Sequence, residues 1–127
     1  MPCNLDLLDH LVLTVANIDA TTDFYTEVLG MDLVISEGRK ALTFGEQQIN
    51  LQQRGHELKP RAAHAMPGSA DLCFITSTPL DEVIGYLADQ RVHIEEGPVE
   101  RVGAAGKLRS VYLRDPDHNL IEVANYV

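Results

Sequence analysis

Hydrophobic and polar positions switch between two periods along the chain, and this switching predicts an α+β fold. Apolar runs with the strand period of two are separated by short turn segments such as Glu37-Gly38 and Gly45-Glu46. Two other segments carry apolar residues at helical spacing, and Gly30 follows the first of them as a C-terminal left-handed residue would. The pattern predicts helices at Thr21–Leu29 and Leu80–Gln90, and strands at Leu7–Val15, Met31–Ser36, Lys40–Phe44, Gln48–Gln52, Ala70–Thr76, Val92–Glu95, Leu108–Arg114 and Asn119–Ala124.

The predicted elements occur twice in the same order, as a strand, a helix and three strands. Residues 54–68 separate the two series, and their prolines, glycines and lack of a sustained period indicate a linker. The sequence therefore predicts one domain of tandem βαβββ modules, with module one at residues 5–53 and module two at residues 69–127. A chance match between two α+β halves is the alternative.

Sliding one module over the other identifies matching positions. An offset of 61 residues places His10 over Asp71 and Tyr25 over Tyr86, and in the last strands an offset of 70 places Gln52 over Glu122. The nine additional residues fit the glycine-rich segment Gly97–Gly106, which has no strand pattern.

Two of these positions carry a chemical signal. His10 and Glu122 each lie in an apolar strand segment, where an ionised carboxylate costs several kcal/mol unless it is paired or binds a metal. In a βαβββ duplication we expect the first and last strands of both modules to line one cleft. One imidazole, two carboxylates and one amide form a mixed nitrogen and oxygen set that suits Zn²⁺, Ni²⁺, Mn²⁺ or Fe²⁺. The predicted metal ligands are His10, Gln52, Asp71 and Glu122.

Each predicted ligand also has a purely structural interpretation. A histidine in an apolar strand is often a core residue that a backbone carbonyl satisfies, and a glutamate near a C-terminus is often paired with a base such as Arg114 or Lys107. Gln52 could be outward polar decoration, and Asp71 a residue that caps the start of a strand. Their joint placement at equivalent positions favours the metal site.

Composition narrows the class of protein. The chain has 127 residues, enough for one domain with its own core, and a formal charge of −9 that disfavours binding to phosphate backbones. No apolar stretch approaches the roughly 20 residues that a membrane helix needs, and the start lacks the pattern of a secretory signal. Cys3 and Cys73 do not form a disulfide framework, and Cys73 is expected to pack as a small hydrophobe. We therefore expect a cytoplasmic protein without nucleic-acid or membrane partners.

Three segments carry a family likeness: Asp9–Val15, Phe24–Met31 and Asp115–Val123, the last reading DPDHNLIEV. They resemble the vicinal oxygen chelate superfamily, which includes glyoxalase I, fosfomycin-resistance and bleomycin-resistance proteins, and extradiol dioxygenases. Lys59–Thr76 and Ile94–Ala104 resemble the glyoxalase domain-containing protein 5 group more closely. The resemblance implies paired modules that form a curved mixed sheet around a cleft, as in the glyoxalase/bleomycin resistance/dihydroxybiphenyl dioxygenase fold.

The resemblance also implies a function. It implies one divalent metal held by His10, Glu122 and the positions of Gln52 and Asp71, with a metal-stabilised enediolate of a small substrate that has adjacent oxygens. Glu122 and Gln52 are the implied catalytic residues of a glyoxalase-type lyase or isomerase, which usually forms a homodimer. Many relatives carry histidine at the position of Asp71, and His56 or His64 of the linker could substitute for it.

Two other functions stay open. The first is an extradiol ring-cleavage dioxygenase, which needs two histidines and one carboxylate on Fe(II), whereas the repeat positions supply one histidine. The second is a non-catalytic protein that binds a small molecule, as bleomycin-resistance proteins do.

Overall fold

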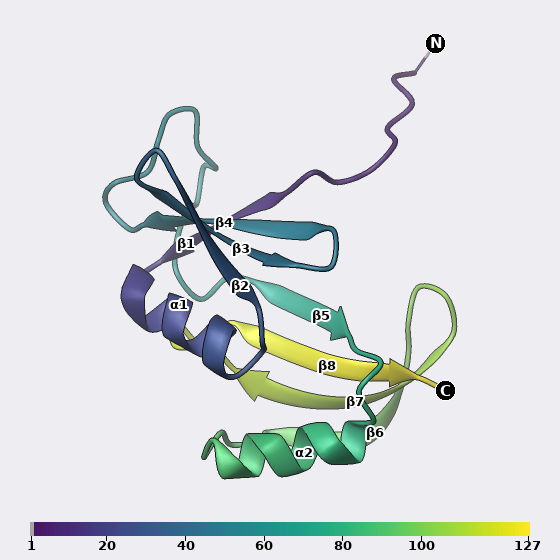
Figure 1. The fold of residues 1–127 in the computed structure, drawn as a ribbon. Helices are drawn as coiled ribbons and strands as arrows, with labels where there is room; N and C mark the ends of the chain where they lie inside the picture. The colour runs from purple at the N-terminus through teal and green to yellow at the C-terminus, as the bar shows by residue number, and fades with distance from the viewer. Residues whose placement is uncertain (1) are drawn as a thin grey trace. The chain divides into compact units, whose positions relative to one another are not determined.

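The computed structural model describes residues 2–127, which divide into two compact units, one ending at Met66 and the other beginning at Pro67. Each unit is a βαβββ module, so the predicted tandem repeat is confirmed (Figure 1). The division between them falls inside the segment predicted as a linker.

The first unit contains one helix and a four-stranded sheet in the order β1-β4-β3-β2. β1 and β4 are parallel, and the other pairs are antiparallel. Asn17 caps the helix, because its side chain accepts a hydrogen bond from the backbone N–H of Ala20 at 3.0 Å. The elements are β1 (Leu11–Val15), α1 (Ile18–Glu27), β2 (Asp32–Ser36), β3 (Arg39–Phe44) and β4 (Gln47–Gln53).

The second unit repeats this arrangement with its sheet in the order β5-β8-β7-β6. β5 is again parallel to the last strand, β8, and the hairpin pairs are antiparallel. Neither helix in residues 2–127 is long and apolar enough to cross a membrane. The elements are β5 (Asp71–Ile75), α2 (Leu80–Asp89), β6 (Glu96–Val102), β7 (Lys107–Arg114) and β8 (Leu120–Tyr126).

Strand β6 corrects two predictions. The residues Val92–Glu95, predicted as a strand, precede β6, whereas Glu96–Val102 pairs with β7 although it was expected to lack strand structure. Proline in a strand argues against a central position, but β6 is an edge strand, where Pro98 is tolerated. The pairing register shifts between Glu96 and Val99, so a simple alternation of apolar and polar residues is absent.

Gly97 permits this edge strand to lie close to its neighbour. Its φ is +114°, a conformation that side chains rarely adopt. A Cβ at this position would lie 2.5 Å from the carbonyl oxygen of Ser110 and 2.9 Å from the Cα of Val111. The glycine that the sequence suggested as a loop residue is therefore needed for strand packing.

Candidate functional site

Each sheet has one apolar face, and the predicted site residues in the strands belong to the opposite face, called the polar face here because it carries their polar side chains. In the first unit, Leu13, Leu42 and Ile49 are buried together with Tyr25 of α1. Because side chains alternate along a strand, Thr14, Asn50 and Gln52 lie on the opposite face. In the second unit Val111, Leu113, Ile121 and Val123 are buried on one face, and the opposite face, which carries Glu122, also has the buried residues Leu108, Ser110 and Ala124.

His10 lies one residue before β1 and is exposed, which corrects its predicted position inside a strand. Its Nδ1 is 2.8 Å from a carboxylate oxygen of Asp9. A carboxylate on one ring nitrogen fixes the tautomer and leaves the other nitrogen, Nε2, as the one that can bind a metal. His10 is therefore a surface imidazole with the partner that metal-binding histidines usually have.

Two amides lie on the polar face of β4. Gln52 donates from Nε2 to Thr14 Oγ1 at 2.8 Å, and Gln48 donates to Asn50 Oδ1 at 2.7 Å. Both Asn50 and Gln52 are half-buried. The side-chain oxygen of Asn50 or of Gln52 could serve as a neutral metal ligand. The alignment of the two modules at the offset of 70 had selected Gln52.

The strand register matches Asn50, rather than Gln52, with Glu122. Val12 is the direct neighbour of Asn50 in the β1–β4 pair, and Cys73 is the direct neighbour of Glu122 in the β5–β8 pair. Since Val12 and Cys73 correspond at the offset of 61 residues, Asn50 and Glu122 correspond at an offset of 72. The offset of 70 used for the last strands is therefore two residues too small.

The helices also differ from the predicted alignment. Tyr25 is fully buried in the first unit, whereas Tyr86 is 44% exposed. The buried counterpart of Tyr25 is Leu87, so the helices correspond at an offset of 62 rather than 61. The helix starts agree with this offset, since α1 begins at Ile18 and α2 at Leu80.

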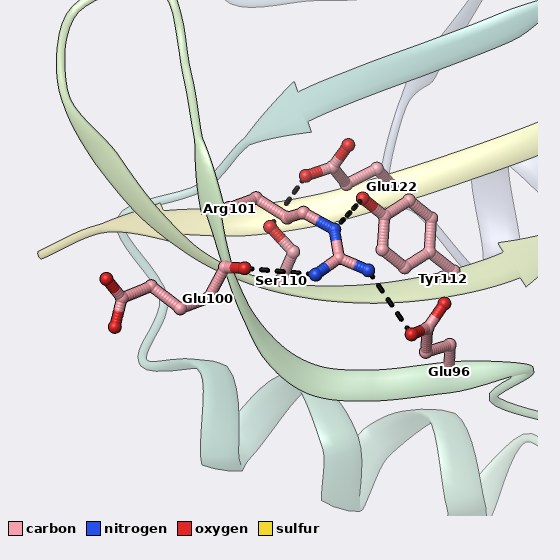
Figure 2. A network of polar contacts seen from close by, with 6 residues as sticks. All are labelled: Glu96, Glu100, Arg101, Ser110, Tyr112 and Glu122. Atoms are coloured by element: carbon pink, nitrogen blue, oxygen red, sulfur yellow. Dashed lines mark hydrogen bonds and ion pairs between the residues drawn. The ribbon is translucent and has the colours of Figure 1, made fainter.

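Glu122 is the half-buried carboxylate that the sequence singled out, and it lies in the middle of β8. Ser110 of β7 donates its hydroxyl hydrogen to Glu122 Oε2 at 2.6 Å (Figure 2). This short, charge-assisted bond holds one carboxylate oxygen and leaves lone pairs on the other. The carboxylate is thus oriented by its own sheet.

Cys73 does not pack as a small hydrophobe, as the apolar run around it suggested. The residue is exposed, and its neighbour across the strand pair is Glu122. Partial burial of the thiol, the charge of Glu122 and its hydrogen bond, and the charge of Asp71 raise the pKa of Cys73 to about 11. Cys73 is therefore a protonated thiol beside the carboxylate at neutral pH.

A guanidinium and a phenol that sequence reasoning did not single out lie on the same face. Arg101 donates from Nε to Tyr112 Oη at 3.0 Å and lies over the Tyr112 ring, 5.4 Å from its centroid. Arg101 also donates to Glu96 Oε1 at 3.2 Å and to the carbonyl oxygen of Glu100 at 3.0 Å (Figure 2). The sequence offered one signal for Tyr112: it lies two residues after Ser110 in β7, so both side chains belong to the face of the sheet that carries Glu122.

The remaining candidates are exposed. Asp71 is the first residue of β5, and its charge is one of the smaller causes that raise the pKa of Arg114, after the hydrogen bond to Glu95. His56 and His64 lie in the segment between β4 and β5, and the backbone N–H of His56 donates to the carbonyl oxygen of Gln53. Arg114 is not the partner of Glu122, as one alternative had it: it bonds Glu95 through two nitrogens, at 3.0 Å each.

The DPDHN segment, the most specific part of the sequence, is a structural turn. Asp115 is buried, and its carboxylate accepts hydrogen bonds from the backbone N–H groups of Asp117 and Asn119 and from the Asn119 side chain. Asn119 Oδ1 in turn accepts from the backbone N–H of Ala70 at 2.8 Å. His118 adopts a φ of +66° in this turn. These bonds join the β7–β8 turn to the start of β5.

The donor types agree with a divalent metal, but each unit supplies only part of the predicted set. His10 and Glu122 each have a hydrogen-bonding partner of the kind that orients metal ligands. Among residues 2–127, no group of three or more His, Cys, Asp or Glu side chains is gathered as a metal site. Two of the predicted ligands belong to residues 2–66 and two to residues 67–127.

The chain is thus built from two βαβββ modules, each of which carries polar side chains on one face of its sheet. A profile of the Glyoxalase/Bleomycin resistance protein/Dioxygenase superfamily matches residues 7–123, and the chain belongs to this superfamily. The chain is 54% identical over 124 residues to virulence protein STM3117 of Salmonella typhimurium, covering 97% of this chain and 86% of that protein. It is 49% identical over 120 residues to the glyoxalase domain-containing protein RDO1 of Mycosarcoma maydis, covering 94% and 68%.

Solved structures confirm the fold. The crystal structure of the Salmonella protein matches with a TM-score of 0.96 at 53% identity, over 98% of this chain and 100% of that one. Lactoylglutathione lyase of Agrobacterium tumefaciens shares the fold at 24% identity and a TM-score of 0.72, over 95% and 94% of the two chains. A mutant of the fosfomycin resistance protein FosX of Listeria monocytogenes, complexed with Mn(II) and a dihydroxypropylphosphonic acid, shares it at 23% identity and 0.69, over 98% and 93%.

Proposed function

We propose that this chain is a metal-dependent lyase or isomerase of glyoxalase type that acts on a small substrate with adjacent oxygen atoms. The observation that carries the proposal is the environment of Glu122. Its carboxylate is half-buried, lies in the middle of a strand, and is oriented by Ser110 at 2.6 Å. A carboxylate held in this way has few structural reasons to be there, since no salt bridge pairs it within the described residues.

The proposed metal is one divalent ion, Zn²⁺, Ni²⁺, Mn²⁺ or Fe²⁺, and the Mn(II) in the FosX complex supports this class. His10, Asp71 and Glu122 would hold it, together with an amide from β4. Gln52 was the amide selected from the sequence, and the strand register favours Asn50 instead. When bound, the ion supplies a Lewis acid that stabilises negative charge on two adjacent oxygens.

The chain's own residues would then manage the proton. Glu122 is the proposed base, which takes a proton from a carbon beside a carbonyl group and returns it to the neighbouring carbon. Gln52 is the proposed second residue. Its amide cannot carry a proton, but Thr14 accepts one of its N–H groups, so its oxygen and remaining N–H are positioned for substrate oxygens.

The metal proposal is tested by metal content. The wild-type protein, purified without added metal and then loaded with Mn²⁺, should hold about one ion per chain by mass spectrometry. His10→Ala and Glu122→Ala should abolish binding, whereas the matched controls His93→Ala and Glu95→Gln should retain it. Wild-type binding that survives both His10→Ala and Glu122→Ala would contradict the proposal, as would a wild-type protein that takes up no divalent ion.

The reaction is tested separately, on the metal-loaded protein. Turnover of a methylglyoxal–thiol adduct supports the lyase, and oxygen uptake with a catechol would instead identify a dioxygenase. Tight binding of a ligand without turnover of either substrate would identify a non-catalytic binding protein.

We also propose a homodimer in the cytoplasm. The proposed ligands come from both modules, which could pair within one chain or between two chains. Mixing His10→Ala with Glu122→Ala protein distinguishes the two arrangements. If the modules pair between chains, each mixed dimer regains one complete set of ligands, and metal binding returns. If they pair within a chain, no mixture binds metal. Gel filtration reports the oligomeric state.

A further inference from the structure

We propose that Arg101 and Tyr112 are positioning residues that orient the carboxylate of Glu122, with Arg101 acting through the phenol of Tyr112. The inference rests on the proposed function only for the role given to Glu122. The positioning itself concerns three side chains of one unit, on neighbouring strands β6, β7 and β8.

The placement follows from strand pairing. Tyr112 lies directly opposite Glu122 in the antiparallel β7–β8 pair, where facing side chains share one face with Cβ atoms about 5 Å apart. Ser110 lies two residues earlier on the same face and already binds Glu122 Oε2. Cys73 lies opposite Glu122 on the other side, in β5. The carboxylate is therefore flanked by hydroxyl or thiol donors from both neighbouring strands.

The direction of the hydrogen bonds is determined by the groups themselves. A guanidinium has five N–H donors and no acceptor, so Tyr112 Oη must accept the bond from Arg101 Nε at 3.0 Å. The single phenol proton is then available to another acceptor, and the residue that lies directly opposite Tyr112 in the β7–β8 pair is the carboxylate of Glu122. Burial raises the pKa of Tyr112, Arg101 lowers it, and the charge and hydrogen bond of Glu122 raise it again. The phenol thus keeps its proton at neutral pH.

Arg101 is itself held in place. Its terminal nitrogens donate to Glu96 Oε1 and to the Glu100 carbonyl oxygen (Figure 2), and its Cζ lies 5.4 Å from the centroid of the Tyr112 ring. These contacts fix the guanidinium on the face that carries Glu122. Loss of Arg101 should therefore free the Tyr112 hydroxyl to rotate, and the carboxylate would lose a defined donor.

The chain offers a matched control. Arg109 bonds Asp81 of α2 at 3.1 Å and so belongs to the helix side of the same sheet. Its side chain is 40% exposed, compared with 39% for Arg101. Replacing Arg109 by glutamine therefore removes an equivalent surface ion pair without altering the surroundings of Glu122.

The first test uses metal-free protein and the ¹³C carboxylate resonance of Glu122. Tyr112→Phe keeps the ring and removes the hydroxyl, and it should shift this resonance. Arg101→Gln should shift it in the same direction, Arg101→Lys should restore part of the wild-type position, and Arg109→Gln should leave it unchanged. An unshifted resonance in Tyr112→Phe, or equal shifts in Arg101→Gln and Arg109→Gln, would overturn the inference.

The second test measures Mn²⁺ affinity in the same variants. Residues that orient a ligand usually change metal affinity by about 10- to 100-fold, and we expect Tyr112→Phe to fall in this range. Because Arg101 acts through Tyr112, adding Arg101→Gln to Tyr112→Phe should cause little further loss. Fully additive losses would overturn the proposed route. A wild-type protein that binds no Mn²⁺ would refute the proposed function, and the carboxylate resonance would still decide the positioning.

Discussion

Gln53 and Asn125 make the same contact in the two halves of the chain. Gln53 Oε1 accepts a hydrogen bond from the backbone N–H of Ile18 at 3.1 Å, and Asn125 Oδ1 accepts one from the N–H of Leu80 at 2.7 Å. Ile18 and Leu80 are the first residues of α1 and α2, whose N–H groups have no partner within their helices. Each amide also donates to a backbone carbonyl just before its helix. The last strand of each module thus fixes the start of its own helix.

We expect this contact to stabilise both modules. Gln53→Ala and Asn125→Ala should each lower the free energy of unfolding by about 1–2 kcal/mol, because a helix-start N–H and a carbonyl lose their partner. Urea denaturation measures the change. Gln47→Ala, an exposed residue at the start of β4, is the control and should change stability by less than about 0.5 kcal/mol. Equal effects at Gln47 and Gln53 would show that the contact contributes nothing.

The same pair of residues supports a prediction about which amide of β4 binds the metal. Gln53 and Asn125 are 72 positions apart, as are Asn50 and Glu122. We therefore expect Asn50→Ala to weaken Mn²⁺ binding by at least about tenfold and Gln52→Ala to weaken it less. Isothermal titration calorimetry measures both. A greater loss in Gln52→Ala would restore the ligand selected from the sequence.

Two glycines of the second unit should respond in opposite ways to alanine. Gly97→Ala places a Cβ 2.5 Å from the Ser110 carbonyl oxygen at a φ of +114°, so β6 must move away. We expect a loss of at least about 2 kcal/mol in unfolding free energy. Gly85 lies in α2 with no atom within 4 Å of the added Cβ, and Gly85→Ala should stabilise by about 0.5–1 kcal/mol. Thermal denaturation of both variants checks the pair.

The reactivity of Cys73 should report on Glu122. The thiolate is the reactive form, and a pKa of about 11 keeps the thiol protonated at pH 8, so alkylation by iodoacetamide should be slow and should accelerate up to about pH 11. Glu122→Gln removes one cause of the raised pKa and should speed alkylation at pH 8 by roughly three- to tenfold. The rates are measured in a Cys3→Ser background by mass spectrometry, with Asp81→Asn as the control. An unchanged rate in Glu122→Gln would mean that the two groups do not interact.

Most of the fold followed from the sequence, because hydrophobic periodicity reports which face of an element is buried. Both helices and most strands lie within a few residues of their predicted bounds. β6 was missed, since an edge strand that contains a glycine, a proline and a register shift has no simple alternation. His10 was placed inside a strand because Leu7 and Leu8 are apolar, yet both are exposed in the structure.

The candidate site was only partly predictable. Glu122 and His10 were singled out because each lies in an apolar segment, and Asp71 followed from the offset of 61. The amide in β4 depended on the number of residues inserted between the modules, which only strand pairing determines. Arg101 could not be found in this way, because its relation to Glu122 runs through Tyr112 and across three strands.

The Asp115–Asn119 turn has a consequence for how such chains are compared. Its buried carboxylate and amide satisfy one another and the backbone around them, and none of these bonds involves the side chains of the polar sheet face. The segment that makes the chain recognisable therefore joins the last hairpin to the start of β5. Likeness in this turn therefore identifies the fold, and the reaction must be determined from the side chains of the sheets.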